Sequence, residues 1–144
     1  MKTTLLVVAM SLLMISCEDS STPPNDGLTA TTDRSTYLAG ETITLGFRNH
    51  GSDVLQLASC CTNVALYIDS WENDTWKQVG ARGLPCLMLC PSIELLVQPE
   101  QTRVDSLSLY DGGTYRLRIP FDERGQGGFE RKVVTNSFAV RISR

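Results

Sequence analysis

An all-β fold is what this sequence predicts, and three observations carry the prediction. From Leu28 onward, β-branched and aromatic residues alternate with polar residues in short segments. Glycine, asparagine, aspartate and proline stand between these segments, where turns are expected. No apolar run keeps the spacing of an amphipathic helix over a useful length. The pattern predicts an antiparallel β-sandwich of about eight or nine strands.

The first 16 residues predict a signal peptide that precedes this domain. Lys2 is positively charged, and the apolar run from Leu5 to Ile15 is far shorter than the roughly 20 residues of a membrane-spanning helix. The end of the run, Met14-Ile15-Ser16-Cys17, resembles the lipobox of bacterial lipoproteins. The resemblance implies that Cys17 becomes the lipidated N-terminus, with more than one acyl chain needed for stable anchoring. An ordinary signal peptide, or an uncleaved anchor with an incidental cysteine, is the alternative.

The residues after Cys17 predict a flexible tether. Residues 18–27 are polar, include two adjacent prolines and offer no apolar side chain to a core. The remaining 117 residues match the commonest size of a single domain. We therefore expect a signal peptide at 1–16, the lipidated cysteine and tether at 17–27, and one domain at 28–144. Lipidation implies a place on a membrane of the bacterial cell envelope, facing the periplasm or the cell surface.

The strands are expected in order along the domain. Glu41 to Asn49 alternates most regularly, which places Ile43, Leu45 and Phe47 on a buried face. The segment before it, 33–40, reads as a turn. The other expected strands are 28–32, 54–58, 64–69, 76–79, 92–97, 102–110, 113–120 and 132–143, with a hairpin tip at 71–76 and a long connection at 80–91.

Two stretches of sequence indicate which kind of sandwich is expected. Asp111-Gly112-Gly113-Thr114-Tyr115-Arg116-Leu117 resembles the D-x-G-x-Y-x-C stretch of immunoglobulin domains, and Gly40 to Phe47 resembles their second strand. The resemblance implies that the Tyr115 hydroxyl bonds to backbone a few residues upstream. Phe47 and Leu117 stand where that family has its two cysteines, so an apolar contact between the sheets is expected in place of a disulfide. These are fold motifs, typical of bacterial immunoglobulin-like domains of unknown function, and they carry no activity.

Four cysteines remain for chemistry once Cys17 is lipidated: Cys60, Cys61, Cys86 and Cys90. An exported chain permits oxidation, so disulfides are expected. A bond between the neighbours Cys60 and Cys61 would close a strained ring, which favours two bridges from this pair to Cys86 and Cys90. Which neighbour joins which partner stays open.

Two other uses of this region compete with a purely structural one. The four thiols, with the Met88 thioether, would suit a soft metal such as copper(I) or zinc, or thiol redox chemistry. The spacing is not C-x-x-C, however, and the single histidine, His50, lies in a polar turn. A loop made rigid at Leu84-Pro85-Cys86 would also suit a β-sandwich protease inhibitor.

Composition and motifs exclude other functions. The net charge of −3 gives no basic excess of the kind found in nucleic-acid-binding proteins. No nucleophile elbow, zinc-protease motif or phosphate-binding glycine loop occurs, so we expect no enzyme activity and no cofactor. What remains is a non-enzymatic, membrane-anchored binding module of the envelope, with an envelope protein or a glycan as its partner.

Two surface features are candidates for that binding. Arg116 and Arg118 alternate outward on one strand and Arg141 on the last, so the three would form a small basic stripe. A solvated face that prevents edge aggregation is the competing explanation. Trp71 and Trp76 flank a hairpin tip, where an exposed pair would anchor a protein or a glycan. Packing of the two rings across the hairpin is the simpler use.

Overall fold

The computed structural model describes residues 27–87, 89–90 and 93–143. The expected signal peptide, the lipidation site Cys17 and all of the tether except Gly27 lie outside these residues. Thirteen strands form the described part of the chain, and it contains no helix. They are β1 (Leu28–Thr32), β2 (Thr36–Leu38), β3 (Thr42–Asn49), β4 (Leu55–Leu57), β5 (Ser59–Cys60), β6 (Asn63–Val64), β7 (Leu66–Glu72), β8 (Thr75–Arg82), β9 (Leu95–Val97), β10 (Thr102–Ser108), β11 (Gly113–Glu123), β12 (Arg131–Val134) and β13 (Phe138–Arg141).

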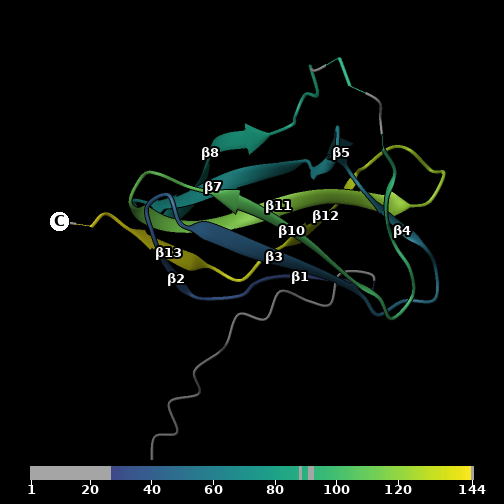
Figure 1. The fold of residues 1–144 in the computed structure, drawn as a ribbon, viewed down its shortest axis with the longest axis horizontal. Helices are drawn as coiled ribbons and strands as arrows, with labels where there is room; N and C mark the ends of the chain where they lie inside the picture. Colours follow the sequence, from purple (N-terminus) through teal and green to yellow (C-terminus); the bar gives the residue numbers. More distant parts are fainter. Residues whose placement is uncertain (1–26, 88, 91–92, 144) are drawn as a thin grey trace, which may run out of the picture.

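Two sheets face each other across the core (Figure 1). The smaller sheet has the order β1-β3-β10, with all pairs antiparallel. The larger sheet is built around β11, which pairs with β13 and then β12 along one edge, and with β7 and then β4 along the other. The β7–β8 hairpin extends this sheet outward, and β2 closes its opposite side by pairing in parallel with β13.

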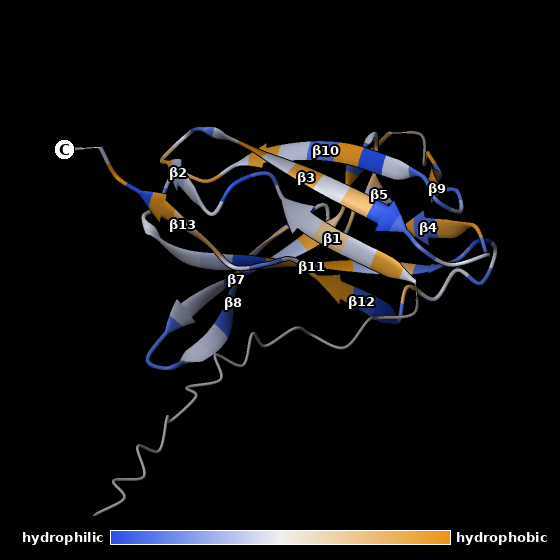
Figure 2. Ribbon diagram, turned by 90° about the horizontal axis from the view of Figure 1, so that it is seen from below, coloured by the Kyte–Doolittle hydropathy of each residue, from blue (hydrophilic) through white to orange (hydrophobic). Residues whose placement is uncertain are grey.

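The core lies between the sheets and is made by residues that alternate along the strands. Ile43, Leu45 and Phe47 on β3 are fully buried, as the sequence pattern predicts. Figure 2 shows this alternation as apolar segments interrupted by polar ones along β3, β10 and β13. Phe47 and Leu117 are both fully buried in the same apolar cluster, at the positions where immunoglobulin domains carry their inter-sheet cysteines.

Tyr115 supplies the second fold marker. Its hydroxyl donates a hydrogen bond of 3.1 Å to the carbonyl oxygen of Asp111, four residues upstream. This is the tyrosine corner that the resemblance implies. The antiparallel sandwich, the parallel pairing of β2 with β13 and this corner identify the domain as an immunoglobulin-like β-sandwich, so the predicted fold class is confirmed.

The strand count departs from the eight or nine expected. The segment 33–40, predicted as a turn, contains β2, because Tyr37 alternates into the core between exposed neighbours. The last predicted strand, 132–143, divides into β12 and β13 around Asn136, whose side chain bonds to the backbone amide and hydroxyl of Thr32 on β1. The return strand of the hairpin continues past Val79 to Arg82, and β5 and β6 form a small separate hairpin.

Candidate functional site

The two disulfides define the region that stands out most from the sandwich. Cys60 is bonded to Cys86 and Cys61 to Cys90, with Cα–Cα distances of 5.3 and 5.4 Å. The bridges join the β5–β6 hairpin to the connection that follows β8. This assigns the pairing that the sequence leaves open.

Backbone conformation explains how two adjacent cysteines reach one loop. Successive side chains of an extended strand point to opposite faces. Cys61 follows β5 with a φ of 58°, in the left-handed region, and this breaks the alternation. Gly83 brings the loop back against the hairpin, where a Cβ atom would lie 2.6 Å from Cβ of Cys60. The approach therefore requires glycine at this position.

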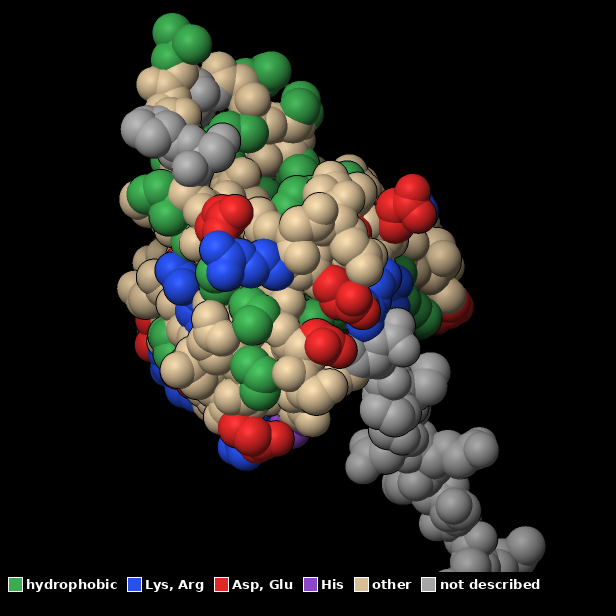
Figure 3. Space-filling view, turned by 90° about the vertical axis from the view of Figure 1, so that its right-hand side faces the viewer, with side chains coloured by type: hydrophobic (Ala, Val, Ile, Leu, Met, Phe, Trp, Pro, Cys, Tyr) green, Lys and Arg blue, Asp and Glu red, His purple; other side chains and the backbone are tan. Residues whose placement is uncertain are grey.

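The bridged loop carries two exposed leucines that we call the apolar tip. Leu87 is 84% exposed and Leu89 is fully exposed. Large apolar side chains gather in this projecting part of the molecule in Figure 3. Ser59 holds the chain just after the loop, because its hydroxyl donates a hydrogen bond of 2.8 Å to the Ile93 carbonyl oxygen. The tip is thus held out from the sandwich by covalent and polar contacts.

The apolar tip lies on the opposite side of the domain from the point where the chain enters. In Figure 1 the bridged loop stands at the top, and β1 begins on the lower side. Whatever is attached ahead of Gly27 therefore joins the domain away from the tip.

The outer surface of β7, β8 and β11 forms a second candidate region, the Asp69 face, made by Tyr67, Asp69, Trp71, Trp76, Gln78, Arg116 and Arg118. The Asp69 side chain is 3% exposed and accepts hydrogen bonds from Arg118 at 2.7 Å and Arg116 at 3.2 Å. Burial acts to raise the pKa of Asp69, but the hydrogen bonds from Arg118 and Arg116 outweigh it, so the pKa is lowered. The carboxylate is therefore held in its charged form.

Aromatic rings cover the same arginines. The guanidinium of Arg116 lies 4.5 Å from the Trp76 ring centre, and that of Arg118 lies 5.0 Å from the Tyr67 ring centre. Trp71 and Trp76 pack edge to face at 5.1 Å between centres. The two tryptophans thus contact each other across the hairpin, which is the simpler use considered for them, although Trp71 remains 43% exposed.

The basic stripe expected from the sequence is not continuous. Arg116 and Arg118 share the Asp69 carboxylate, which neutralises one of their two charges. Arg141 lies on β13 opposite Leu38 of β2, beyond the end of the β11–β13 pairing at Gly113. Sequence reasoning missed this arrangement, because Asp69 is an acidic residue at the end of a predicted strand that otherwise looks apolar.

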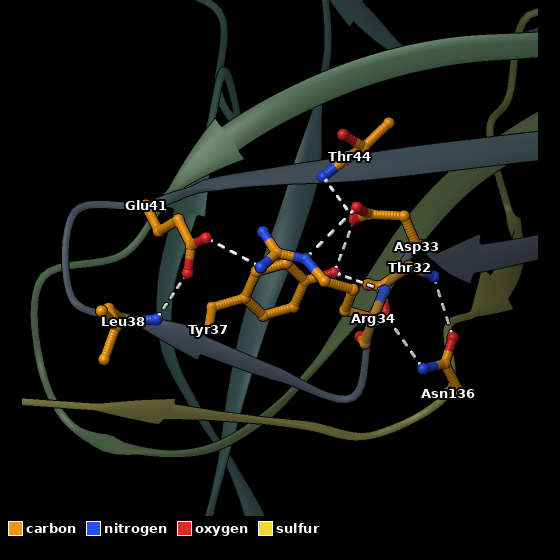
Figure 4. Close-up of polar contacts among 8 residues, drawn as sticks. All are labelled: Thr32, Asp33, Arg34, Tyr37, Leu38, Glu41, Thr44 and Asn136. Carbon is orange, nitrogen blue, oxygen red and sulfur yellow. Dashed lines mark hydrogen bonds and ion pairs between the residues drawn. The ribbon is translucent and has the colours of Figure 1, made fainter.

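A third region, a polar cluster, fixes the crossover from β1 to β2 (Figure 4). Tyr37 donates to Asp33 at 2.7 Å, and the backbone amide of Thr44 donates to the same oxygen at 3.0 Å. The hydrogen bond from Tyr37 is the main cause of the lowered pKa of Asp33. The backbone amide of Leu38, followed by Arg34 at 2.7 Å, lowers the pKa of Glu41. These groups satisfy one another, so the cluster serves to hold β2.

A fourth contact ties the bridged region to the smaller sheet. Arg82, the last residue of β8, donates to the carbonyl oxygens of Val64 and Ser106 and forms an ion pair with Asp105. Asp105 also accepts a hydrogen bond of 2.9 Å from the backbone amide of Val64. The β5–β6 hairpin is therefore clamped to β10 beside the disulfides, a contact that the sequence did not suggest.

The remaining sequence candidates are placed as follows. His50 is exposed, and its Nε2 atom lies 3.0 Å from the Thr29 hydroxyl oxygen. It does not belong to the cysteine cluster. The Sγ atoms of Cys60, Cys61 and Cys90 lie within 4.8 Å of one another, which makes them a candidate soft-metal set if their bridges were opened. Among the described residues, no helix is long and apolar enough to cross a membrane.

Comparison with known proteins identifies solved structures of similar fold, but no similar sequence. No protein family and no curated protein matches the sequence. Among solved structures, Spo0M, a sporulation control protein of Bacillus subtilis, is 9% identical over 82% of this chain with a TM-score of 0.43, and this chain spans 49% of it. The CARDB domain of PF1109 from Pyrococcus furiosus is 15% identical over 81% of this chain and 94% of that one (TM-score 0.37).

A third similar structure is the ASH/PapD-like domain 7 of human CEP192, 14% identical over 99% of this chain and 95% of that one, with a TM-score of 0.36. At these identities and scores the likeness carries no argument about function. The fold assignment rests on the strand topology and the tyrosine corner described above.

Proposed function

We propose that this protein is a non-enzymatic, lipid-anchored interaction module of the bacterial cell envelope, which presents the apolar tip to a protein partner. The observation that carries the proposal is the exposure of Leu87 and Leu89 on a loop closed by two disulfides. Contiguous exposed apolar side chains mark interaction sites, and a partner that covers these leucines gains the free energy of removing them from water. Bridges that hold them in place also reduce the entropy lost when a partner binds.

The position of the tip supports this function. A chain anchored through Cys17 would enter the domain at β1, and the tip lies on the other side (Figure 1). The polar tether, residues 18–27, would span at most about 35 Å when extended. The anchor would therefore leave the tip uncovered, free to contact proteins of the envelope.

Site-specific photo-crosslinking in intact cells tests the partner. A photoreactive residue replaces Leu87 in one variant and Val104 in the control. Val104 is also apolar and 63% exposed, but it lies on β10. We expect a defined adduct from position 87 only, and a loss on the order of tenfold when Leu89→Asp is added. Identical adducts at both positions, or none at position 87, would contradict the proposal.

Membrane fractionation tests the anchor separately. The chain with its natural Cys17 should sediment with membranes and be released only by detergent. Mass spectrometry of the membrane-bound chain should show acyl chains on Cys17, and Cys17→Ser should lack them, because the thioether to the lipid cannot form. An unmodified Cys17 in the parent would show that the lipobox resemblance is misleading, and it would leave the partner experiment unaffected.

A protease inhibitor is the second candidate, favoured by the same bridged loop. An exposed apolar side chain on a rigid loop suits the specificity pocket of a protease that prefers leucine. Inhibition of an envelope or secreted protease by the intact chain, abolished by Leu87→Asp but retained by Val104→Asp, would support it. Equal loss in both variants would dismiss it.

A further inference from the structure

The four bridged cysteines stand close enough to serve a second chemistry. The Sγ atoms of Cys60, Cys61 and Cys90 all lie within 4.8 Å of one another, and Sγ of Cys86 is bonded to that of Cys60. In a tetrahedral zinc–thiolate centre the zinc–sulfur bonds of about 2.3 Å separate the sulfurs by about 3.8 Å. Three of the four sulfurs therefore lie near the spacing of such a centre, and the fourth, on Cys86, is bonded to one of them.

We propose that reduction of both bridges converts them into a four-thiolate site for a divalent zinc-type ion, formed by Cys60, Cys61, Cys86 and Cys90. Oxidised, the same atoms are bonded to each other and cannot bind the ion. The site is thus controlled by redox state. It does not depend on the interaction proposed for the apolar tip.

The backbone around the cysteines fits this role because two ligands are fixed without the bridges. Cys60 belongs to the β5–β6 hairpin, and Cys61 directly follows β5 with its left-handed conformation. That hairpin stays clamped to β10 through the contacts of Val64 with Arg82 and Asp105. The loop that carries Cys86 and Cys90 would supply the other two ligands. A zinc-type ion accepts four thiolates without other donors.

The burial of the four cysteine residues indicates which sulfur an external reductant attacks first. Cys60 is buried, Cys61 and Cys90 are half-buried, and Cys86 is exposed. A thiolate of an external dithiol attacks Sγ of Cys86, the Cys86–Cys60 bond breaks, and its electron pair leaves on Sγ of Cys60. The second thiol of the reductant then closes the reductant's own disulfide and frees Cys86.

A second dithiol equivalent reduces the Cys61–Cys90 bridge in the same way. Two dithiols thus become two disulfides while the two protein bridges become four thiols. Binding one divalent ion then releases the four thiol protons and leaves a complex with two negative charges. In the reverse direction, two equivalents of a disulfide oxidant accept the four electrons by thiol–disulfide exchange, become dithiols, and return both bridges as the ion is released.

Cobalt(II) titration tests the site, because tetrahedral cobalt–thiolate centres absorb visible light. The full chain carries Cys17→Ser, so that only the four domain cysteines supply thiols, and it is reduced without oxygen. We expect saturation at one cobalt per chain, displacement of cobalt by zinc, and no absorption from the oxidised chain. Cys86→Ser should weaken binding by at least about tenfold, whereas His50→Ala, which removes the single histidine, should leave it unchanged.

Circular dichroism of the same samples separates a built site from thiols on an unfolded chain. The reduced chain with zinc should keep the β-sheet spectrum of the oxidised protein. The proposal is overturned if no one-to-one saturation occurs, if Cys86→Ser binds as tightly as the parent, or if metal binds only while the β spectrum is lost.

Discussion

The Asp69 face and the apolar tip are both surface regions rich in residues associated with binding, yet they differ in one respect. On the Asp69 face, Arg116 and Arg118 are each paired with Asp69 and each covered by an aromatic ring. On the apolar tip, Leu87 and Leu89 extend into solvent. Residue type alone therefore does not mark a binding surface. A side chain whose interactions are already satisfied inside the domain supports the fold, and an exposed apolar one is available.

The first test of this difference is to remove the bridges that hold the tip. Replacing Cys60, Cys61, Cys86 and Cys90 together by serine should lower the free energy of unfolding by about 4 kcal/mol. The first bridge closes a loop worth about 3.5 kcal/mol in the chain-entropy account, and the second closes nearly the same loop and adds less. Urea denaturation of the oxidised parent and the variant measures the difference. An unchanged unfolding midpoint would mean that the bridges do not constrain the unfolded chain.

The second is to break the pairing on the Asp69 face. Asp69→Asn should lower the free energy of unfolding by about 2 to 3 kcal/mol, because two partly buried guanidinium groups then lose their shared carboxylate. Asp74→Asn, in the exposed turn of the same hairpin, is the matched control and should change stability by less than about 0.5 kcal/mol. Equal effects of the two substitutions in urea denaturation would show that the Asp69 pairing contributes nothing.

The pH dependence of stability also tests the pairing of Asp69. The pKa values of Asp69, Asp33 and Glu41 are lowered from ordinary values of 3.8 for aspartate and 4.5 for glutamate. A carboxyl whose folded pKa is lowered adds stability above its unfolded pKa, and this stability is lost as the pH falls through the folded value. The melting temperature should therefore be level above about pH 5 and fall below it. Asp69→Asn should reduce that fall; an identical slope in the variant would exclude Asp69 as a contributor.

The smallest change in stability is expected at the apolar tip. Leu87→Asp with Leu89→Asp should alter the free energy of unfolding by less than about 0.5 kcal/mol, because both side chains are already in solvent. A stability loss above about 2 kcal/mol would show that the leucines pack inside the domain in solution, and the contrast with the Asp69 face would fail.

The fold was largely predictable because the core strands obey a local rule. Ile43, Leu45 and Phe47 alternate with polar residues, and Tyr115 stands in a stretch whose geometry is shared by a whole fold class. By contrast, β2 escaped prediction, since a three-residue strand around Tyr37 is too short to show alternation.

The candidate sites were less predictable because they depend on pairs distant in sequence. Arg118 and Asp69 are 49 residues apart, and only the register of β11 on β7 brings them together. Outward-facing arginines looked free in the sequence for this reason. The cysteine partners were similarly undetermined by the sequence, because either neighbour could reach the loop, and the structure assigns them.

The positions of the four cysteines also change what a proteolytic cut can do. A single cut between Cys61 and Cys86 leaves both bridges spanning it, and a cut between Cys86 and Cys90 still leaves the Cys61–Cys90 bridge. Neither cut divides the oxidised protein into separate molecules. A protease can thus cut the exposed loop without releasing a fragment, and the domain remains one covalent body for as long as its bridges stay oxidised.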